Sequence, residues 1–482
     1  MNFLKNKKVL LVGLGRLGGG VSTAKFLYKN GAKLTITDLN SEKELKKSVA
    51  QLKNINPHTN KRGSIISVGV KATFHLGGHK ENDFRNSDIV VFNPAVSFFS
   101  PWVKLAKKYK KEFYNDYTLF LKLLSQKLSD KKFIGVTGTR GKTTVTTWIG
   151  HILSPSIIGG NIPQNGLLKI MDKITSKTPL VLELSSYQLE YIDKSFISPH
   201  IAVITNLSPD HLNRYGTMER YLDVKANIFK NQTKNDFLVL NYLDKYTPKF
   251  LSKKPKSQIY YFSIKPLPKN KNGLFFSGDN VYFQNQDKKE FVSKFKNLSP
   301  HQKNNLLASM LACHLYGLTW KEILPKTKNL PEVLFRQQTI LKKGALIVVN
   351  DSASTSPEGV TAAIERFKNY KGNFILITGG TDKNLDFKRV SQHIKEYVKE
   401  KNLFLLNGTA TKKLVSTLAK LKYFKKSPQF FDNLEAIVKG LPKLKKGAVV
   451  FSPGGSSFEK FKNEFDRGNK FNQFIRKYYG NN

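Results

Sequence analysis

The chain is poor in cysteine, in acidic residues and in long hydrophobic runs. Its 482 residues include one cysteine, Cys313, which excludes an internal disulfide and is typical of a reducing compartment. No apolar run approaches the roughly 18 residues that cross a bilayer, so we expect no membrane insertion. The first residues lead into an apolar strand without the apolar segment of a signal peptide, and we expect a cytoplasmic protein.

The shortage of acid leaves a formal net charge of +45, from 80 Lys and Arg against 35 Asp and Glu. Such a charge is one indication of nucleic-acid binding. The lysines are nevertheless spread over the whole chain, without a basic arm or an aromatic-rich RNA-binding motif. A general bias of the composition toward lysine explains this spread better than nucleic-acid binding does. A positive field would also attract anionic ligands. We therefore expect no nucleic-acid partner, and a nucleic-acid-stimulated NTPase stays open as an alternative.

The stretch over residues 135–147 predicts a phosphate-binding loop. It reads Gly-Val-Thr-Gly-Thr-Arg-Gly-Lys-Thr-Thr-Val-Thr-Thr, between an apolar strand and a helical segment. A glycine turn at a helix N-terminus offers backbone N–H groups to phosphate, and a following Lys-Thr supplies a cation and a hydroxyl for Mg²⁺. The spacing departs by one residue from the common G-x-x-x-x-G-K-[ST] loop, because Val136 stands where its first glycine is expected.

Near the N-terminus a second glycine turn predicts a dinucleotide-type fold. A strand over 8–12 is followed by Gly13-Leu-Gly15-Arg-Leu-Gly18, a helix from about Ser22, and a strand over 33–37 that ends in Asp38. This spacing is that of a Rossmann fingerprint, and its literal interpretation is an NAD-dependent dehydrogenase. We expect a third strand at 88–92, followed by a turn at Asn93.

Further motifs follow the phosphate loop in a fixed order. They are Gly-Gly-Asn (159–161), Glu-Leu-Ser-Ser-Tyr-Gln-Leu (183–189), Asn-Leu-Ser-Pro-Asp-His-Leu (206–212), Gly-Gly-Thr-Asp-Lys (379–383) and Ser-Pro-Gly-Gly-Ser-Ser-Phe (452–458). Together with the Thr-Gly-Thr-x-Gly-Lys-Thr-Thr loop, this series resembles the Mur ligase family over nearly the whole chain. The Glu-Leu-Ser-Ser-Tyr-Gln-Leu form resembles the glutamate-adding members in particular.

The resemblance implies an α/β protein of three domains. Residues 1–112 would form a Rossmann-like domain that binds the UDP substrate, and 113–329 a central P-loop-type ATPase domain. Residues 330–482 would form a C-terminal Rossmann-like domain that binds glutamate. The role of 245–296, where we expect extra strands, stays open. We expect a monomer.

The resemblance also assigns the ATP and metal sites. Expected ATP contacts are Gly138, Thr139, Gly141, Lys142, Thr143, Thr144, Asn305, Arg336 and Asp351. Two Mg²⁺ ions would be held by Thr143, Glu183, His211 and Lys225, the last as a carbamylated lysine. Lys142, Glu183, His211 and Lys225 are the expected catalytic residues. Gln302 departs from the family's asparagine on the adenine side.

The two remaining substrates are assigned in the same way. The UDP substrate would contact Leu14, Arg16, Leu17, Asp38, Asn93 and Asn161. Glutamate would contact Thr355, Lys383, Ser457 and Phe458. The family's lysine after Asn-Asp-Ser is replaced by Ala353, which leaves the choice between D- and L-glutamate open.

The implied reaction is an ATP-dependent addition of glutamate, with D-glutamate expected first, to UDP-N-acetylmuramoyl-L-alanine in peptidoglycan synthesis. It would proceed through an acyl phosphate. The alternative within the family is a ligase for L-glutamate or another amino acid.

Overall fold

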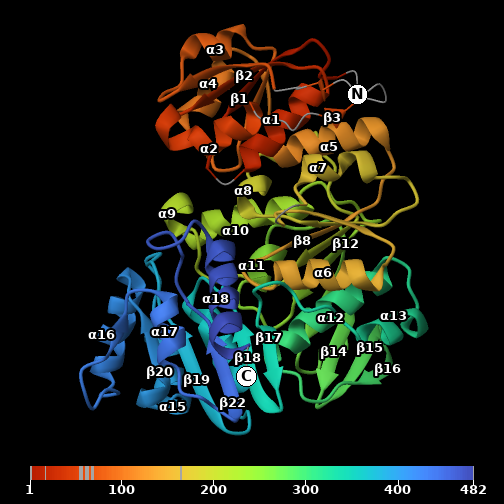
Figure 1. Ribbon diagram of the computed structural model, residues 1–482. Coiled ribbons are helices and arrows are strands. Elements are labelled where there is room, and N and C mark those ends of the chain that lie inside the picture. Colours follow the sequence, from red (N-terminus) through yellow and green to blue (C-terminus); the bar gives the residue numbers. More distant parts are fainter. Residues whose placement is uncertain are drawn as a thin grey trace. The chain divides into compact units, whose positions relative to one another are not determined.

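The computed structural model describes residues 3–16, 18–53, 58–59, 65–66, 70–162 and 165–480. Three larger sheets and one two-stranded ribbon, β3 (His58–Thr59) with β4 (Ile65–Ile66), form within these ranges. Helices accompany each larger sheet, so the α/β prediction is confirmed (Figure 1). No helix in the described ranges is both long and apolar enough to span a membrane.

The first sheet is parallel, with the strand order β5-β2-β1-β6-β7. Its strands are β1 (Lys8–Val12), β2 (Lys33–Asp38), β5 (Ala72–Leu76), β6 (Ile89–Phe92) and β7 (Glu112–Asn115). Its helices are α1 (Gly19–Lys29), α2 (Glu42–Lys53), α3 (Glu81–Asn86) and α4 (Pro101–Lys108).

Alternation along β1 explains the two helical layers of this sheet. Val9 and Leu11 belong to the cluster that includes α1 and α2, whereas Leu10 and Val12 belong to the cluster that includes α3 and α4. Because successive strand side chains point to opposite faces, a run of four buried residues covers both faces.

The prediction that the strand at 88–92 is the third of this region was wrong. β5 precedes it and pairs with β2 at the sheet edge. Its residues, Ala-Thr-Phe-His-Leu, are mostly half-buried, so the strand lacks the continuous apolar run that marks a central strand.

The second sheet has nine strands in the order β16-β15-β14-β13-β12-β11-β8-β10-β9. Its strands are β8 (Ile134–Thr137), β9 (Ile157–Gly160), β10 (Leu180–Glu183), β11 (Ile201–Ile204), β12 (Phe237–Asn241), β13 (Gln258–Ser263), β14 (Gly273–Ser277), β15 (Asn280–Asn285) and β16 (Lys288–Lys294). The strands from β9 to β14 are parallel, and β14, β15 and β16 form an antiparallel extension. Extra strands were therefore correctly expected within 245–296.

The helices of this region lie between residues 116 and 327. They are α5 (Asp116–Lys127), α6 (Lys142–Ile152), α7 (Leu167–Ile170), α8 (Ser186–Leu189), α9 (Leu212–Tyr215), α10 (Met218–Ala226), α11 (Thr247–Leu251), α12 (Pro300–Leu315) and α13 (Trp320–Thr327). Short 3-10 turns cover Met171–Lys173 and Asn227–Phe229.

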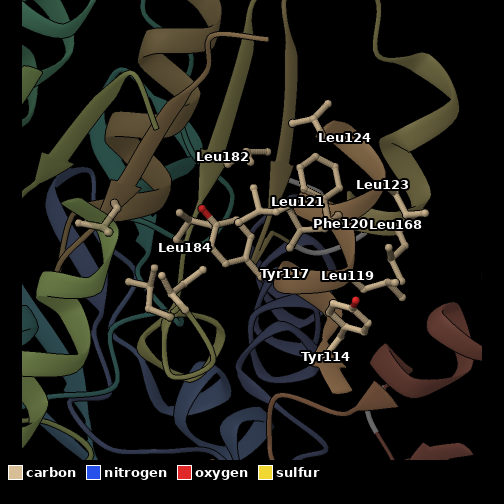
Figure 2. Packing of buried hydrophobic residues seen from close by; sticks show 14 of the residues in the cluster. Tyr114, Tyr117, Leu119, Phe120, Leu121, Leu123, Leu124, Leu168, Leu182 and Leu184 are labelled. Atoms are coloured by element: carbon tan, nitrogen blue, oxygen red, sulfur yellow. The ribbon is translucent and has the colours of Figure 1, made fainter. Parts of the chain in front are cut away.

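Helix α5 is packed on nearly all sides by apolar side chains (Figure 2). Tyr117, Phe120 and Leu124 lie in one buried cluster with Leu182 and Leu184. Leu182 lies in β10, and Leu184 is the first residue after it. The same cluster continues into the first sheet, so α5 belongs to a core shared by the first two sheets. Asn115 caps α5 and also donates to the Gln188 carbonyl at 2.8 Å, which ties α5 to α8.

The third sheet has the order β17-β18-β22-β19-β20-β21, and only β17 is antiparallel to its neighbour. Its strands are β17 (Gln338–Lys343), β18 (Ala345–Asn350), β19 (Asn373–Thr378), β20 (Leu403–Leu406), β21 (Phe430–Phe431) and β22 (Lys446–Phe451). Its helices are α14 (Pro357–Phe367), α15 (Lys388–Tyr397), α16 (Thr409–Lys420), α17 (Leu434–Gly440) and α18 (Glu464–Tyr479), with a 3-10 turn at Glu400–Asn402.

By Cα proximity the chain divides into two compact units. The first comprises residues 1–208, 212–296 and 303–329, and thus the first two sheets. The second comprises 209–211, 297–302 and 330–482, and thus the third sheet.

Candidate active site

The predicted phosphate loop joins β8 to the N-terminus of α6. Two glycines hold backbone conformations that side chains disfavour, with φ of 138° at Gly138 and 81° at Gly141. Gly141 is the N-cap residue of α6, and no side chain caps this helix end. A helix N-terminus presents backbone N–H groups that have no acceptor within the helix itself, which is the arrangement that binds phosphate.

The neighbouring segment after β11 holds this loop in place. The Arg140 N–H donates to the Asn206 side-chain oxygen at 3.0 Å, and Asn206 Nδ2 donates back to the Arg140 carbonyl at 3.0 Å. Thr205 Oγ1 donates to the same carbonyl at 2.6 Å, and the Thr139 N–H donates to the Asn206 carbonyl at 2.9 Å. The loop is thus fixed before a ligand arrives.

Thr205 and Asn206 were missed as site residues by the sequence analysis. Asn206 begins the motif at 206–212, in which only His211 received a role, and Thr205 directly precedes it. Their one sequence signal is position, because they follow a strand that pairs in parallel with β8 and therefore ends at the same sheet edge.

Glu183 lies at the end of β10, on the other side of β8. Its side chain is buried, and Asn161 Nδ2 donates to Oε1 at 3.1 Å. The second oxygen, Oε2, is inaccessible and has no hydrogen-bond partner among the described residues. A buried carboxylate oxygen left in this state is costly unless a cation binds it, so the residue fits a Mg²⁺ ligand.

Two lysines donate to the backbone of the loop. Lys142 Nζ contacts the Thr139 carbonyl at 3.1 Å, and the buried Lys225 Nζ contacts the Gly138 carbonyl at 2.9 Å. Lys225 lies in the last turn of α10, directly before the 3-10 turn at Asn227–Phe229. Both cations therefore lie beside the loop that would receive the phosphates.

The remaining ATP-loop candidates are close in space to these residues. Thr143 and Thr144 lie in the first turn of α6. Asn305 faces Gly141 so closely that a Cβ on this glycine would lie 2.6 Å from Asn305 Oδ1. Helix α12, which carries Asn305, also contacts α6 through Ser309 and the buried Cys313.

His211 and the preceding Asp210 belong to the second compact unit. Its backbone is left-handed, with φ of 54°, and its N–H donates to Asp210 Oδ1 at 3.0 Å. No group of three His, Cys, Asp or Glu side chains suited to a metal ion occurs in the described ranges. The assignment of His211 to a metal stays a prediction.

Four of the UDP-site candidates, Leu14, Arg16, Asp38 and Asn93, lie in or near the first glycine turn, whereas Asn161 follows β9 and contacts Glu183. Asp38 is buried, and its carboxylate accepts from the Gly15 N–H at 2.8 Å and from Asn40. Leu14 is buried, whereas Arg16 is exposed and pairs with Glu44. Leu17 lies outside the described residues.

Asn93 packs directly on this glycine turn. A Cβ on Gly13 would lie 2.9 Å from the Asn93 Cβ, so only glycine fits there. The Asn93 side chain also accepts from the Ala95 N–H at 3.0 Å and so shapes its own turn. The structure thus brings Asp38 and Asn93 to the same turn from two strands.

In the second unit, Asp351 and Arg336 are the ATP candidates. Burial raises the pKa of the Asp351 carboxyl to about 6, and this group accepts from Ser452 Oγ at 2.8 Å. Arg336 donates to the Ala353 carbonyl at 2.5 Å. Phe335 and Gln337, on either side of Arg336, both have positive φ, a strain that is common where a side chain must be held in one direction.

The glutamate candidates belong to loops at the ends of the third sheet's strands. Lys383 Nζ donates to Thr355 Oγ1 at 3.3 Å, so two of the four are in contact. Ser457 Oγ is buried and has no hydrogen-bond partner within the described residues, and Phe458 is exposed. A buried hydroxyl without a partner fits a position that a polar ligand completes.

Arg467 was missed by the sequence analysis; it follows the last motif at 452–458. It is fully buried and donates to the carbonyls of Ser352, Gly455 and Ser456. Burial lowers the pKa of its guanidinium to about 10. Arg467 therefore joins the two loops that carry Ala353 and Ser457.

A glycine loop at a helix N-terminus, with a buried carboxylate on the neighbouring parallel strand, is typical of phosphate-binding α/β enzymes. Residues 136–313 match the family described as Mur ligase middle domain. Over 98% of both chains, the sequence is 33% identical to a UDP-N-acetylmuramoylalanine–D-glutamate ligase of Borreliella afzelii. It is 34% identical to the enzyme of the same name from Clostridioides difficile, over 97% of this chain and 98% of the other.

Solved structures show the same fold. A UDP-N-acetylmuramate–alanine ligase from Thermotoga maritima aligns over 98% of this chain and all of its own, with a TM-score of 0.58 and 18% identity. A pseudomurein peptide ligase from Methanothermus fervidus aligns over the same shares, with a TM-score of 0.53 and 17% identity. The chain belongs to the Mur ligase family.

Replacing Gly138 by alanine tests the phosphate loop. The new Cβ would lie 2.0 Å from Thr205 Oγ1, and alanine disfavours the φ of 138°, so the loop must move. We expect kcat/KM for ATP to fall by about 100-fold or more, measured as phosphate release at varied ATP.

Gly166→Ala is the matched control, because a Cβ there meets nothing within 4 Å. Thermal melting checks that both variants fold. Wild-type ATP kinetics in Gly138→Ala would contradict the assignment of this loop.

Proposed function

We propose that this chain is an ATP-dependent ligase that joins glutamate to UDP-N-acetylmuramoyl-L-alanine in peptidoglycan synthesis. The full-length likeness to UDP-N-acetylmuramoylalanine–D-glutamate ligases carries this proposal. The geometry that supports it is the preformed phosphate loop beside the buried, incompletely bonded Glu183. Because ATP and the nucleotide-linked sugar are cytoplasmic compounds, we also propose that the enzyme acts in the cytoplasm.

The chemistry begins with a carboxylate, which is a poor electrophile. The alanine carboxylate oxygen attacks the γ-phosphorus of ATP, the bond to ADP breaks, and an acyl phosphate forms. The glutamate amine then attacks the acyl carbon, the C–N bond forms and inorganic phosphate leaves, while the amine loses a proton. In this scheme Lys142 and the N–H groups of α6 stabilise charge on the transferring phosphoryl group.

Mg²⁺ would be held at this site by Glu183 and the Thr143 hydroxyl, with His211 as a further ligand. Oxygen ligands of this kind suit a hard divalent ion. When bound, the metal would neutralise charge on the phosphate oxygens.

We further propose that Lys225 becomes a carbamate by addition of its amine to CO2, with release of a proton. Its Nζ is buried beside the loop carbonyl of Gly138, where a carbamate would replace a cation by oxygen ligands. This modification would supply an anionic group for a second Mg²⁺.

The three sheets suggest a division of labour between three domains. We propose that 1–112 binds the UDP part of the substrate, that 113–329 binds ATP, and that 330–482 binds the amino acid. For the amino acid, the contact between Lys383 and Thr355 and the buried Ser457 hydroxyl support one pocket. Lys383 would pair with a glutamate carboxylate, a role that matters more because Ala353 cannot contribute a charge.

An amino-acid-dependent phosphate-release assay tests the function. With ATP, Mg²⁺ and UDP-N-acetylmuramoyl-L-alanine present, we expect release with D-glutamate and at most weak release with L-glutamate, meso-diaminopimelate or L-lysine. Release only with L-glutamate would overturn the isomer, and release with neither isomer would overturn the function. Stimulation by DNA or RNA, without the muramoyl substrate, would favour the nucleic-acid-stimulated NTPase suggested by the +45 charge.

Two variants of Lys225 test the carbamate. Lys225→Ala removes the group, and we expect activity to fall by about 100-fold or more and to recover in part with a short carboxylic acid. Lys225→Arg keeps the positive charge but cannot form this carbamate, so we expect it to stay inactive. Near-wild-type activity in either variant, measured by phosphate release, would refute the modification.

A further inference from the structure

A largely buried arginine holds the turn that follows β6. Arg214 in α9 donates to three successive carbonyls of this turn, at 3.0 Å to Pro94, 2.8 Å to Ala95 and 3.3 Å to Val96. This turn begins at Asn93, whose side chain packs against Gly13 in the first glycine turn. One side chain from the second sheet's region thus fixes the backbone of a loop in the first.

Glu190 completes the contact from a second direction. Its carboxylate accepts both arms of Arg214, with Nε to Oε1 at 2.6 Å and Nη2 to Oε2 at 2.7 Å. It also accepts from the Phe98 N–H at 3.0 Å and from the Tyr215 hydroxyl at 2.7 Å. Both ends of the turn are therefore hydrogen-bonded to one ion pair.

The surroundings make this pair rigid. The Glu190 side chain is 1% exposed and that of Arg214 is 10% exposed. The guanidinium also lies over the Tyr187 ring, 3.9 Å from its centre. A planar fork with five donors can satisfy a carboxylate and several carbonyls at once, which a lysine cannot do.

Glu190 and Arg214 are both close in the sequence to expected catalytic residues. Glu190 follows α8, which begins three positions after Glu183. Arg214 stands three positions after His211 in the sequence. The ion pair therefore links the turn at 93–98 to the parts of the chain that carry the candidate metal ligands.

We propose that Arg214 and Glu190 are positioning residues that hold the turn at 93–98 for the UDP-linked substrate. This inference rests on the proposed function, in which residues 1–112 bind the UDP part of that substrate. The pair sets the distance between the substrate-binding turn and the phosphate loop, and so places the alanine carboxylate for phosphoryl transfer. Small errors in such placement cost large factors in rate.

The test is Arg214→Lys, which keeps the charge but loses the fork. We expect kcat/KM for UDP-N-acetylmuramoyl-L-alanine to fall by about 10- to 100-fold. Binding of ATP, measured by calorimetry without the muramoyl substrate, should stay within about twofold of wild type, because the loop contacts of Thr205 and Asn206 are untouched.

Two further variants control for stability. Lys29→Ala breaks an exposed ion pair with Asp172, 2.7 Å long, that also joins the region of the first sheet to that of the second, and we expect no kinetic change. The double variant Arg214→Met with Glu190→Gln leaves no buried charge unpaired, so it should fold and still show the selective loss.

Two results would overturn the proposal. One is an unchanged kcat/KM for the muramoyl substrate in Arg214→Lys. The other is an equal loss of ATP binding, which would mark the pair as merely structural. A wild-type enzyme that does not use the muramoyl substrate would instead refute the proposed function.

Discussion

The hydrogen bonding of the phosphate loop to the segment after β11 is the constraint on which the candidate site depends. The Thr139 and Arg140 N–H groups and the Arg140 carbonyl are all hydrogen-bonded to this segment, so the conformation of the loop is fixed from outside. Asn206 and Thr205 do this from a neighbouring strand end, and Gly138 leaves the space that Thr205 Oγ1 occupies. A loop held in this way binds phosphate without a large cost in conformational entropy.

Around this loop the parallel sheet gathers charge of both signs. Glu183 arrives from β10 on one side of β8, and the segment after β11 arrives from the other. Lys142 and Lys225 donate to carbonyls of the loop itself. Phosphoryl transfer needs both cations for the phosphates and oxygen ligands for a metal, and burial makes each of these interactions stronger than it would be in water.

The sequence predicted the parts of this arrangement that depend on local pattern. Short motifs predicted the glycine turns, the apolar strands that end at Asp38 and Glu183, and the family. The predicted α/β fold is confirmed. Contacts between distant segments were not predictable. Arg214 is some 120 positions from the turn that it holds, and Arg467 is 115 from Ser352. Edge strand β5 was missed because an edge strand needs no continuous apolar run.

The central claim is that the alanine carboxylate becomes phosphorylated, and oxygen transfer tests it most directly. UDP-N-acetylmuramoyl-L-alanine labelled with ¹⁸O in its alanine carboxylate is incubated with the enzyme, ATP, Mg²⁺ and D-glutamate. Mass spectrometry of the released phosphate should find one labelled oxygen in each molecule, because the acyl C–O bond breaks when the amine attacks. Unlabelled phosphate, formed together with the amide product, would contradict the acyl-phosphate route.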